Sequence, residues 1–96
     1  MTIYYKPTAN EISLNTTGNS VVTTTTTGQG VLVRIINTGG SVGVLVFQYA
    51  NGSQYANMSI LPANAYGEVI VWKNNTDLLV ANTGTMVAVP VAFKGI

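Results

Sequence analysis

Apolar and polar residues alternate along most of this chain with a period of two, which is typical of β-strands that bury one face. The pattern is clearest over residues 30–61, where two apolar strands flank a turn at residues 37–41 and a third strand follows Asn51-Gly52. We interpret this stretch as an antiparallel core to which the other strands are added. No stretch shows the 3.6-residue period of an amphipathic helix, so the regular structure is expected to be β.

Asn51-Gly52 predicts a two-residue type I′ turn, because both positions of such a turn need a residue that tolerates positive φ. Counting back from a tight turn gives one wholly apolar face, which we expect to be the core side, with the pairs Phe47–Ala56, Leu45–Met58 and Gly43–Ile60. The opposite face pairs Gln48 with Tyr55 and carries Val42, Val44 and Val46 beside polar residues. That mixed composition predicts a surface covered only in part, and another chain is a candidate for the cover.

The first strand of the core is expected at residues 31–36, and the remaining residues supply further short strands, expected at residues 11–14, 21–27, 67–73, 78–81 and 86–93. Five consecutive threonines at 23–27 favour an edge strand, because β-branched side chains favour extended backbone. In the last strand we expect the core face to hold Val87, Val89, Val91 and Phe93. Pro90 would then lie on the other side and place the strand at an edge or at a bulge.

Seven or eight strands at this spacing predict an all-β, single-domain antiparallel β-sandwich of jelly-roll or immunoglobulin-like kind. A chain of 96 residues supports one modest core, which we assign to residues 11–96. Residues 1–10 contain Ile3, Tyr4 and Tyr5 before Pro7, which interrupts pairing because proline has no N–H. They form either an arm that reaches a neighbour or a first edge strand on the same domain.

The composition lacks most of the side chains that are used in catalysis and metal binding. Cysteine and histidine are both absent, so the chain has no disulfide, no thiolate metal ligand and no imidazole base. The three acids, Glu11, Glu68 and Asp77, are not brought together by any motif. We therefore expect a protein that is not an enzyme and that has no catalytic, cofactor-binding or metal-binding residues.

Nucleic acid and membranes are also unexpected partners. The four basic residues are scattered and cannot form a stripe that neutralises several phosphates. No apolar run approaches the ~20 residues of a spanning helix, and the first residues lack the pattern of a signal peptide. The chain is expected to be kept, or assembled, in the cytosol.

Only 7% of the residues are charged, against about 25% in typical soluble domains. A surface of Asn, Thr, Ser and Gly forms hydrogen bonds but provides little charge repulsion between copies. We therefore expect a homo-oligomer, with a candidate assembly interface at Ile3, Tyr4, Tyr5, Val42, Val44 and Val46. The plainer interpretation is a neutral domain with no such interface.

A carbohydrate-binding or host-attachment module is the alternative function. Its candidate site is the tip of the Asn51-Gly52 hairpin, where aromatic rings and amides lie close in sequence: Tyr49, Asn51, Gln54 and Tyr55. Tyr66 and Trp72 offer further stacking faces. Aromatic residues of a small sandwich also serve to fill its core, so both interpretations stay open.

The C-terminal half resembles small virion structural proteins of tailed phages, especially those that infect cyanobacteria. The similarity lies in a strand that ends in Lys73, followed by Thr76-Asp77, the short apolar strand 78–81 and the Val/Ala-rich strand 87–93. It implies a β-sandwich that decorates or cements a capsid as a homo-oligomer, with a trimer favoured, bound to the major capsid protein. The implied location is a virion assembled in the host cytoplasm, and a tail component is the nearest variant.

Overall fold

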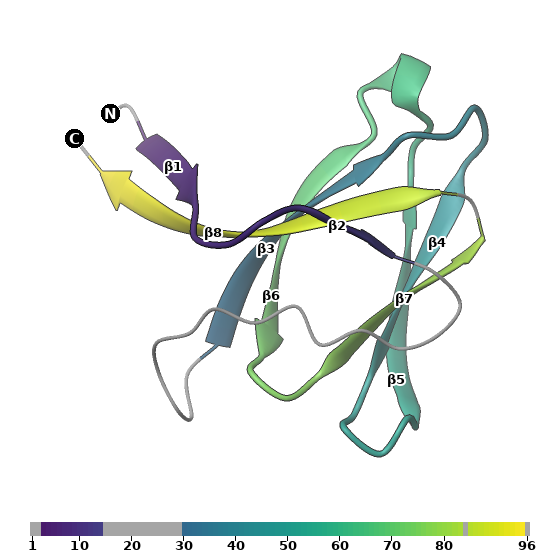
Figure 1. Cartoon of the computed structure of the whole chain (residues 1–96). Helices are drawn as coiled ribbons and strands as arrows, with labels where there is room; N and C mark the ends of the chain where they lie inside the picture. Colours follow the sequence, from purple (N-terminus) through teal and green to yellow (C-terminus); the bar gives the residue numbers. More distant parts are fainter. Residues whose placement is uncertain (1–2, 15–29, 84, 96) are drawn as a thin grey trace.

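The computed structural model describes residues 3–14, 30–83 and 85–95, and over these residues the protein is an all-β sandwich (Figure 1). The turn expected at residues 15–19 and the threonine-rich strand expected at 21–27 lie outside the described residues. One 3₁₀ helix, η1 (Ala63–Ala65), connects two of the strands. The eight strands in the described part of the chain are β1 (Ile3–Pro7), β2 (Ile12–Leu14), β3 (Gly30–Asn37), β4 (Gly43–Gln48), β5 (Gln54–Ile60), β6 (Glu68–Asn74), β7 (Leu78–Thr83) and β8 (Met86–Gly95).

The strands form two antiparallel sheets. The five-stranded sheet has the order β1-β8-β3-β6, with β2 also paired to β8, and the three-stranded sheet has the order β5-β4-β7. The hairpin β4–β5 is enclosed in sequence by the pair β3–β6, and that pair is enclosed by β2–β8. The chain therefore resembles one long hairpin rolled into two layers. This nesting is the jelly-roll arrangement, one of the two predicted kinds of sandwich.

The register of the β4–β5 hairpin follows the sequence pattern, but its turn does not. Phe47 pairs with Ala56, and the predicted pairs continue down to Gly43 and Ile60. The turn is a three-residue loop rather than type I′, because only Gly52 has positive φ and the N–H of Tyr49 donates to the carbonyl of Ser53. The register therefore shifts after Phe47, and Gln48 lies opposite Gln54 instead of Tyr55.

Asn37 closes the predicted turn between β3 and β4. Its fully buried side chain donates from Nδ2 to the carbonyls of Ser41 and Ile60, at 2.9 and 3.2 Å. Its Oδ1 accepts the N–H of Gly39 at 2.9 Å. Each polar atom of this amide is therefore bonded, and the amide links the end of β3 to the end of β5 across the two sheets.

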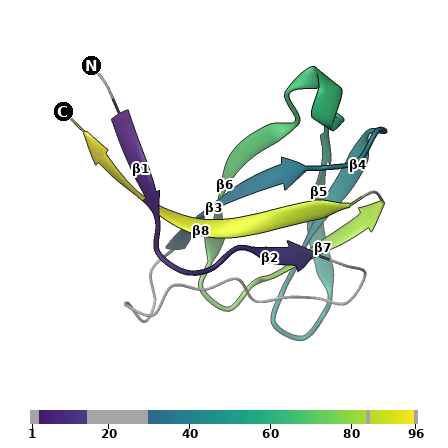
Figure 2. The ribbon, with the colours of Figure 1, turned by 45° about the horizontal axis from the view of Figure 1, so that its top comes forward.

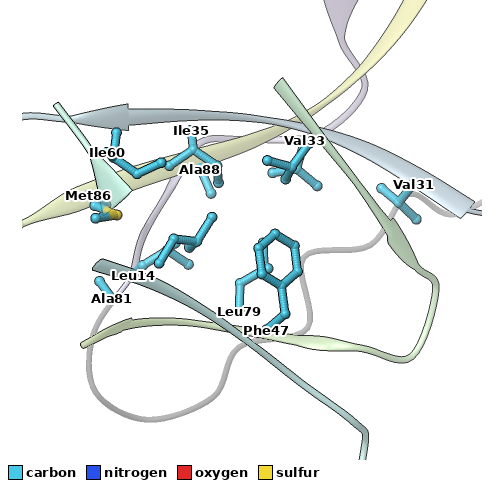
Figure 3. Close-up of a cluster of buried hydrophobic side chains, with 12 residues drawn as sticks. Leu14, Val31, Val33, Ile35, Phe47, Ile60, Leu79, Ala81, Met86 and Ala88 are labelled. Carbon is cyan, nitrogen blue, oxygen red and sulfur yellow. The ribbon is translucent and has the colours of Figure 1, made fainter. Parts of the chain in front are cut away.

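The core lies between the sheets and is filled by alternate residues of the facing strands (Figure 3). Val33 and Ile35 of β3 are fully buried, as are Leu45 of β4 and Leu79 of β7. The expected core face of β8 is wrong. Met86, Ala88 and Pro90 are fully or almost fully buried, and the first two belong to the core cluster, whereas Val87, Val89 and Val91 do not.

The pairing with β3 decides which face of β8 turns inward. Val33 lies opposite Pro90 and Ile35 opposite Ala88, so Pro90 and Ala88 share the core side with the inward residues of β3. Both faces of β8 are apolar in sequence, and a one-residue change of register would exchange them. The alternation of residues along β8 therefore does not indicate which of its two faces is buried.

Pro90 is tolerated in an interior strand because the strand beside it is interrupted there. β8 lies between β3 on one side and β1 and β2 on the other, so it is not an edge strand. β1 ends opposite Val91, β2 begins opposite Ala88, and the intervening Thr8 donates its N–H to the carbonyl of Pro90 at 2.9 Å. The proline thus lacks an N–H where regular pairing has already stopped, as expected for a bulge.

The two ends of the described chain form a two-stranded ribbon, which we call the terminal ribbon and define as residues 3–7 and 91–95. Its last paired residues are Ile3 and Gly95, whereas β3 accompanies β8 only as far as Val91. Figures 1 and 2 show the ribbon extending away from the body of the sandwich. Of the residues expected to form an arm or an edge strand, residues 3–7 thus pair within their own chain and project from the sandwich.

Candidate protein-binding surface

The face of the five-stranded sheet that points away from the core is largely apolar, and we call it the outer face. β6 turns Val71 and Lys73 inward, which leaves Ile70 and Trp72 outside. The outer face is built from alternate residues of three strands: Leu32, Arg34 and Ile36 of β3, Glu68, Ile70 and Trp72 of β6, and Val87, Val89 and Val91 of β8.

Several of these apolar side chains remain exposed. Trp72 is 60% exposed and Ile70 36%, while Leu32 and Ile36, beside them on β3, are only half-buried. Phe93, on the terminal ribbon, is 44% exposed. Single exposed apolar residues are ordinary, but neighbouring ones on adjacent strands form a patch of the kind that binds other protein.

The charged groups of the outer face neutralise each other. Arg34 donates from Nε to Oε2 of Glu68 at 2.9 Å, and its Nη2 contacts the same oxygen. Both side chains are partly exposed, so this pair contributes little to stability. Its effect on the surface is larger, because it leaves the apolar patch without net charge.

Two hollows lie on either side of Arg34. The larger, of about 530 Å³, is lined by Ile36, Thr38, Ala63, Tyr66 and Glu68, together with Asn37 and Gly67. The smaller, of about 330 Å³, lies between the β1–β2 connection and the buried Val89 and Val91 of β8. Arg34 lines both, so the outer face is hollowed at its β6 end and at its β1–β2 end.

Tyr66 forms the rim of the larger hollow in an unusual conformation. It follows η1 with φ 59° and ψ 49°, a left-handed position where glycine is preferred and other residues cost about 1 kcal/mol. Its side chain is 94% exposed, so burial in its own chain does not offset that cost. The next residue must be glycine, because a Cβ on Gly67 would lie 1.8 Å from the carbonyl oxygen of Leu61.

The structure brings the predicted ligand-tip residues together, and hydrogen bonds within the fold use one side-chain polar atom each of Tyr55 and Asn51. The rings of Tyr49 and Tyr55 lie 4.6 Å apart at 30°, and both are exposed. The hydroxyl of Tyr55 donates to Oδ2 of Asp77 at 2.6 Å, and Oδ1 of Asn51 accepts the N–H of Ser53. Gln54 is exposed beside them. The tip therefore offers a pair of neighbouring rings beside the exposed side chains of Asn51 and Gln54.

The residues predicted as an assembly interface are dispersed. Val46 is only 5% exposed and Val44 is half-buried, so of the three valines Val42 alone presents much accessible surface. Ile3 and Tyr5 belong to β1 in the terminal ribbon, on the other sheet, and pair with Gly95 and Phe93. Tyr4, between them, pairs with Lys94. These six positions do not form one continuous face.

Lys73 and Asp77 form a buried polar cluster at the β6–β7 turn. Nζ of Lys73 donates to three backbone carbonyls, those of Asn74, Asn75 and Asp77, at 3.1, 3.3 and 2.9 Å. Burial lowers the pKa of Lys73, and the nearby Asp77 carboxylate opposes that shift. Burial, and then the hydrogen bond to Asp77, raise the pKa of Tyr55 to about 12. These groups are engaged in holding the turn.

The alternation of strand 67–73 contains a signal for the outer face. Strand 67–73 alternates so that either Lys73 or the row of Glu68, Ile70 and Trp72 must face the core. A lysine can be buried when backbone carbonyls surround its ammonium group, and the turn after Lys73 provides them. Neither the larger hollow nor the conformation of Tyr66 has a comparable signal, because both depend on how η1 approaches β3.

Among the described residues, no group of three or more acidic side chains is close enough to hold a metal ion. No helix in that part of the chain has the length and apolar character needed to cross a membrane. Comparisons with protein-family models, with curated proteins and with solved structures found no significant match to this chain.

Proposed function

We propose that this protein is a structural component of a virus particle that self-associates and binds other virion protein through the outer face. The favoured role is a capsid decoration or cement protein on the major capsid protein, as the resemblance of the C-terminal half implies. The single observation that supports it best is the outer face itself, with exposed Trp72 and Ile70 around a self-neutralised Arg34–Glu68 pair.

The energetics of a small domain favour this role. Burying an exposed apolar side chain against a partner yields ~25 cal/mol per Å² removed from water, and an uncharged patch adds little desolvation cost. A partner that binds only the folded state also stabilises a domain whose own core is small. A coat protein uses such contacts and needs no chemistry of its own.

The test replaces Trp72 by glutamate. Because the side chain is already mostly exposed, the isolated domain should fold with little change in melting temperature, while the buried charge should weaken self-association and particle binding at least ~tenfold. Sedimentation velocity and co-sedimentation with purified particles measure the two effects. Tyr49→Glu is the matched control, since it introduces the same charge at an exposed aromatic residue outside the outer face.

Unchanged association of Trp72→Glu would remove the outer face from the proposal. Loss of association in Tyr49→Glu instead would move the binding surface to the β4–β5 tip. That result, joined to binding of a defined glycan by the wild-type protein, would favour the carbohydrate-binding alternative, for which the neighbouring exposed rings of Tyr49 and Tyr55 are the supporting observation.

A further inference from the structure

β5 is an exposed edge strand of the three-stranded sheet. It pairs with β4 on one side, and in the described part of the chain no strand pairs with its other side. Successive residues of a strand point to opposite faces, yet the first residues of β5 are all exposed: Gln54, Tyr55, Ala56 and Asn57. Both faces of this part of β5 are therefore open to solvent, and its free edge offers backbone N–H and C=O groups to another strand.

The pairing with β4 shows which residues of β5 direct their backbone groups outward. The N–H of Tyr49 donates to the carbonyl of Ser53, and in an antiparallel pair every second residue then bonds to the partner strand. That series continues through alternate pairs of the hairpin: Phe47–Ala56, Leu45–Met58 and Gly43–Ile60. The residues of β5 between these pairs, Asn57 and Ser59, therefore point their N–H and C=O groups away from β4.

The other edges of the two sheets are protected against strand addition. β6 turns Lys73 inward, and β1 contains Lys6 and Pro7. β2 has only three residues, and β7 is buried along its middle, where Val80 and Ala81 are each 3% exposed. β5 contains neither a charged residue nor a proline. Among the described strands, β5 is thus the exposed edge that lacks the usual devices against pairing with another chain.

We propose that β5 pairs antiparallel with β5 of a second copy across a two-fold axis at Met58, which joins the two three-stranded sheets into one continuous sheet. Asn57 of each copy then lies opposite Ser59 of the other, and their outward backbone groups exchange hydrogen bonds. A second copy suits this edge because it presents the same unpaired groups and because no charges meet along β5. Such a contact closes at two copies, so larger assemblies need the outer face on the other sheet.

The side chains of β5 favour this register. Met58 is partly buried and packs against the core cluster, so placing it against its symmetry mate continues the core into the second copy. Tyr55, before Met58, is brought next to Leu61 of the other copy, which lies equally far after Met58. These two side chains are 40% and 57% exposed, and each covers the other in the pair. An axis at Asn57 would place Leu61 opposite Ser53 instead, so apolar matching selects the axis at Met58.

The register determines which single cysteine can cross-link two copies. The chain has no cysteine of its own, so an introduced thiol reacts without competition. Residues directly opposite each other in such a pair have Cα atoms about 4.5–5.5 Å apart, which is within the range of a disulfide. Met58→Cys should therefore form a disulfide-linked dimer with oxidised glutathione. Ala56→Cys is the matched control, because residue 56 lies opposite Ile60 and its two copies are about 14 Å apart, too far to cross-link.

Asn57→Pro tests the backbone contact. Proline removes an N–H that faces solvent in the free protein, so the domain should still fold, which a thermal melt verifies. Pairing with a second strand loses that donor, and the dimer should weaken at least about tenfold. Asn57→Ala removes the same side chain but keeps the N–H, so it should still form the dimer. Sedimentation velocity compares the two in the Trp72→Glu background, which disables the outer face and leaves β5 intact.

The possible failures are distinguishable from those of the function proposed above. Equal cross-linking of the two cysteine variants, or equal association of Asn57→Pro and Asn57→Ala, would overturn the β5 contact and leave the role of the outer face untouched. If Asn57→Ala stays monomeric at millimolar concentration while Asn57→Pro alone loses particle binding, a strand of another virion protein occupies the edge and the pairing of copies is wrong. A β5 dimer of a protein that binds no particle would retain the contact and remove the proposed function.

Discussion

Tyr55 is an additional residue in the pairing of β4 with β5, and this changes the contacts that its side chain makes. Regular pairing would place it opposite Gln48, on the face away from the core. The register shift after Phe47 makes Tyr55 the additional residue of β5, and its ring lies 6.2 Å from that of Phe47. From there its hydroxyl reaches the buried carboxylate of Asp77. The bulge thus directs the hydroxyl of Tyr55 toward the polar cluster of Lys73 and Asp77.

Tyr55→Phe should lower the free energy of unfolding at neutral pH by about 1–2 kcal/mol, because it keeps the ring and removes one donor from Asp77. The pH dependence tests the same contact. The folded pKa of Tyr55 is raised to about 12, above the ordinary value of 10.0, so its stabilising effect is present below pH 10 and is lost as the pH rises toward 12. Urea unfolding of both proteins at several pH values measures the difference, and a constant difference from pH 9 to 12 would contradict the assignment.

At the scale of elements, β6 combines an open edge with an inward lysine. In the described part of the chain β6 pairs only with β3, so its other edge has unpaired backbone groups. Lys73 points inward near its end, and a charge turned inward on an edge strand is a known obstacle to further strand addition. The same ammonium group donates to the carbonyls of the β6–β7 turn, so one residue both opposes strand addition and holds the turn.

Replacing Lys73 by methionine should destabilise the domain by about 2 kcal/mol, because the buried carbonyl of Asp77 and two part-buried carbonyls lose their donor while the volume of the side chain is nearly kept. The midpoint of urea unfolding measures the change. Lys6→Met provides the control, since Lys6 is exposed and its loss should alter stability by less than about 0.5 kcal/mol. Equal effects of the two substitutions would show that the contacts of Lys73 add no stability.

At the scale of the whole molecule, the scarcity of charge determines how copies can meet. Most of the surface can neither attract nor repel strongly, and the ion pair of the outer face is already satisfied within the chain. Association must then come from apolar contact, shape and hydrogen bonds.

Self-association should therefore depend weakly on salt. Raising NaCl from about 0.05 to about 0.5 M should change the dissociation constant by less than about threefold, because screening acts on few charges. Ammonium sulfate at similar ionic strength should strengthen association, since excluded salts favour burial of apolar surface. Sedimentation equilibrium in each buffer measures both effects, and a tenfold weakening in NaCl would assign the contact to ion pairs instead.

The class of the fold and much of the central hairpin follow from local sequence pattern. The period of two, the turn residues at 37–41 and the apolar pairs from Phe47–Ala56 to Gly43–Ile60 are local properties, and all of them appear in the structure. The absence of helical periodicity was equally local. These predictions succeed because strand alternation and turn chemistry act between residues close in sequence.

Three features depend on tertiary contacts instead: the inward face of β8, the direction of the Tyr55 side chain and the hollows of the outer face. The first depends on the pairing of Val33 with Pro90, which are far apart in the chain. The second depends on a bulge, and the third on the approach of η1 to the end of β3. Where both faces of a strand are apolar, local pattern leaves two nearly equal choices. Packing against distant strands selects one, because it alone fills the core without leaving polar groups unpaired.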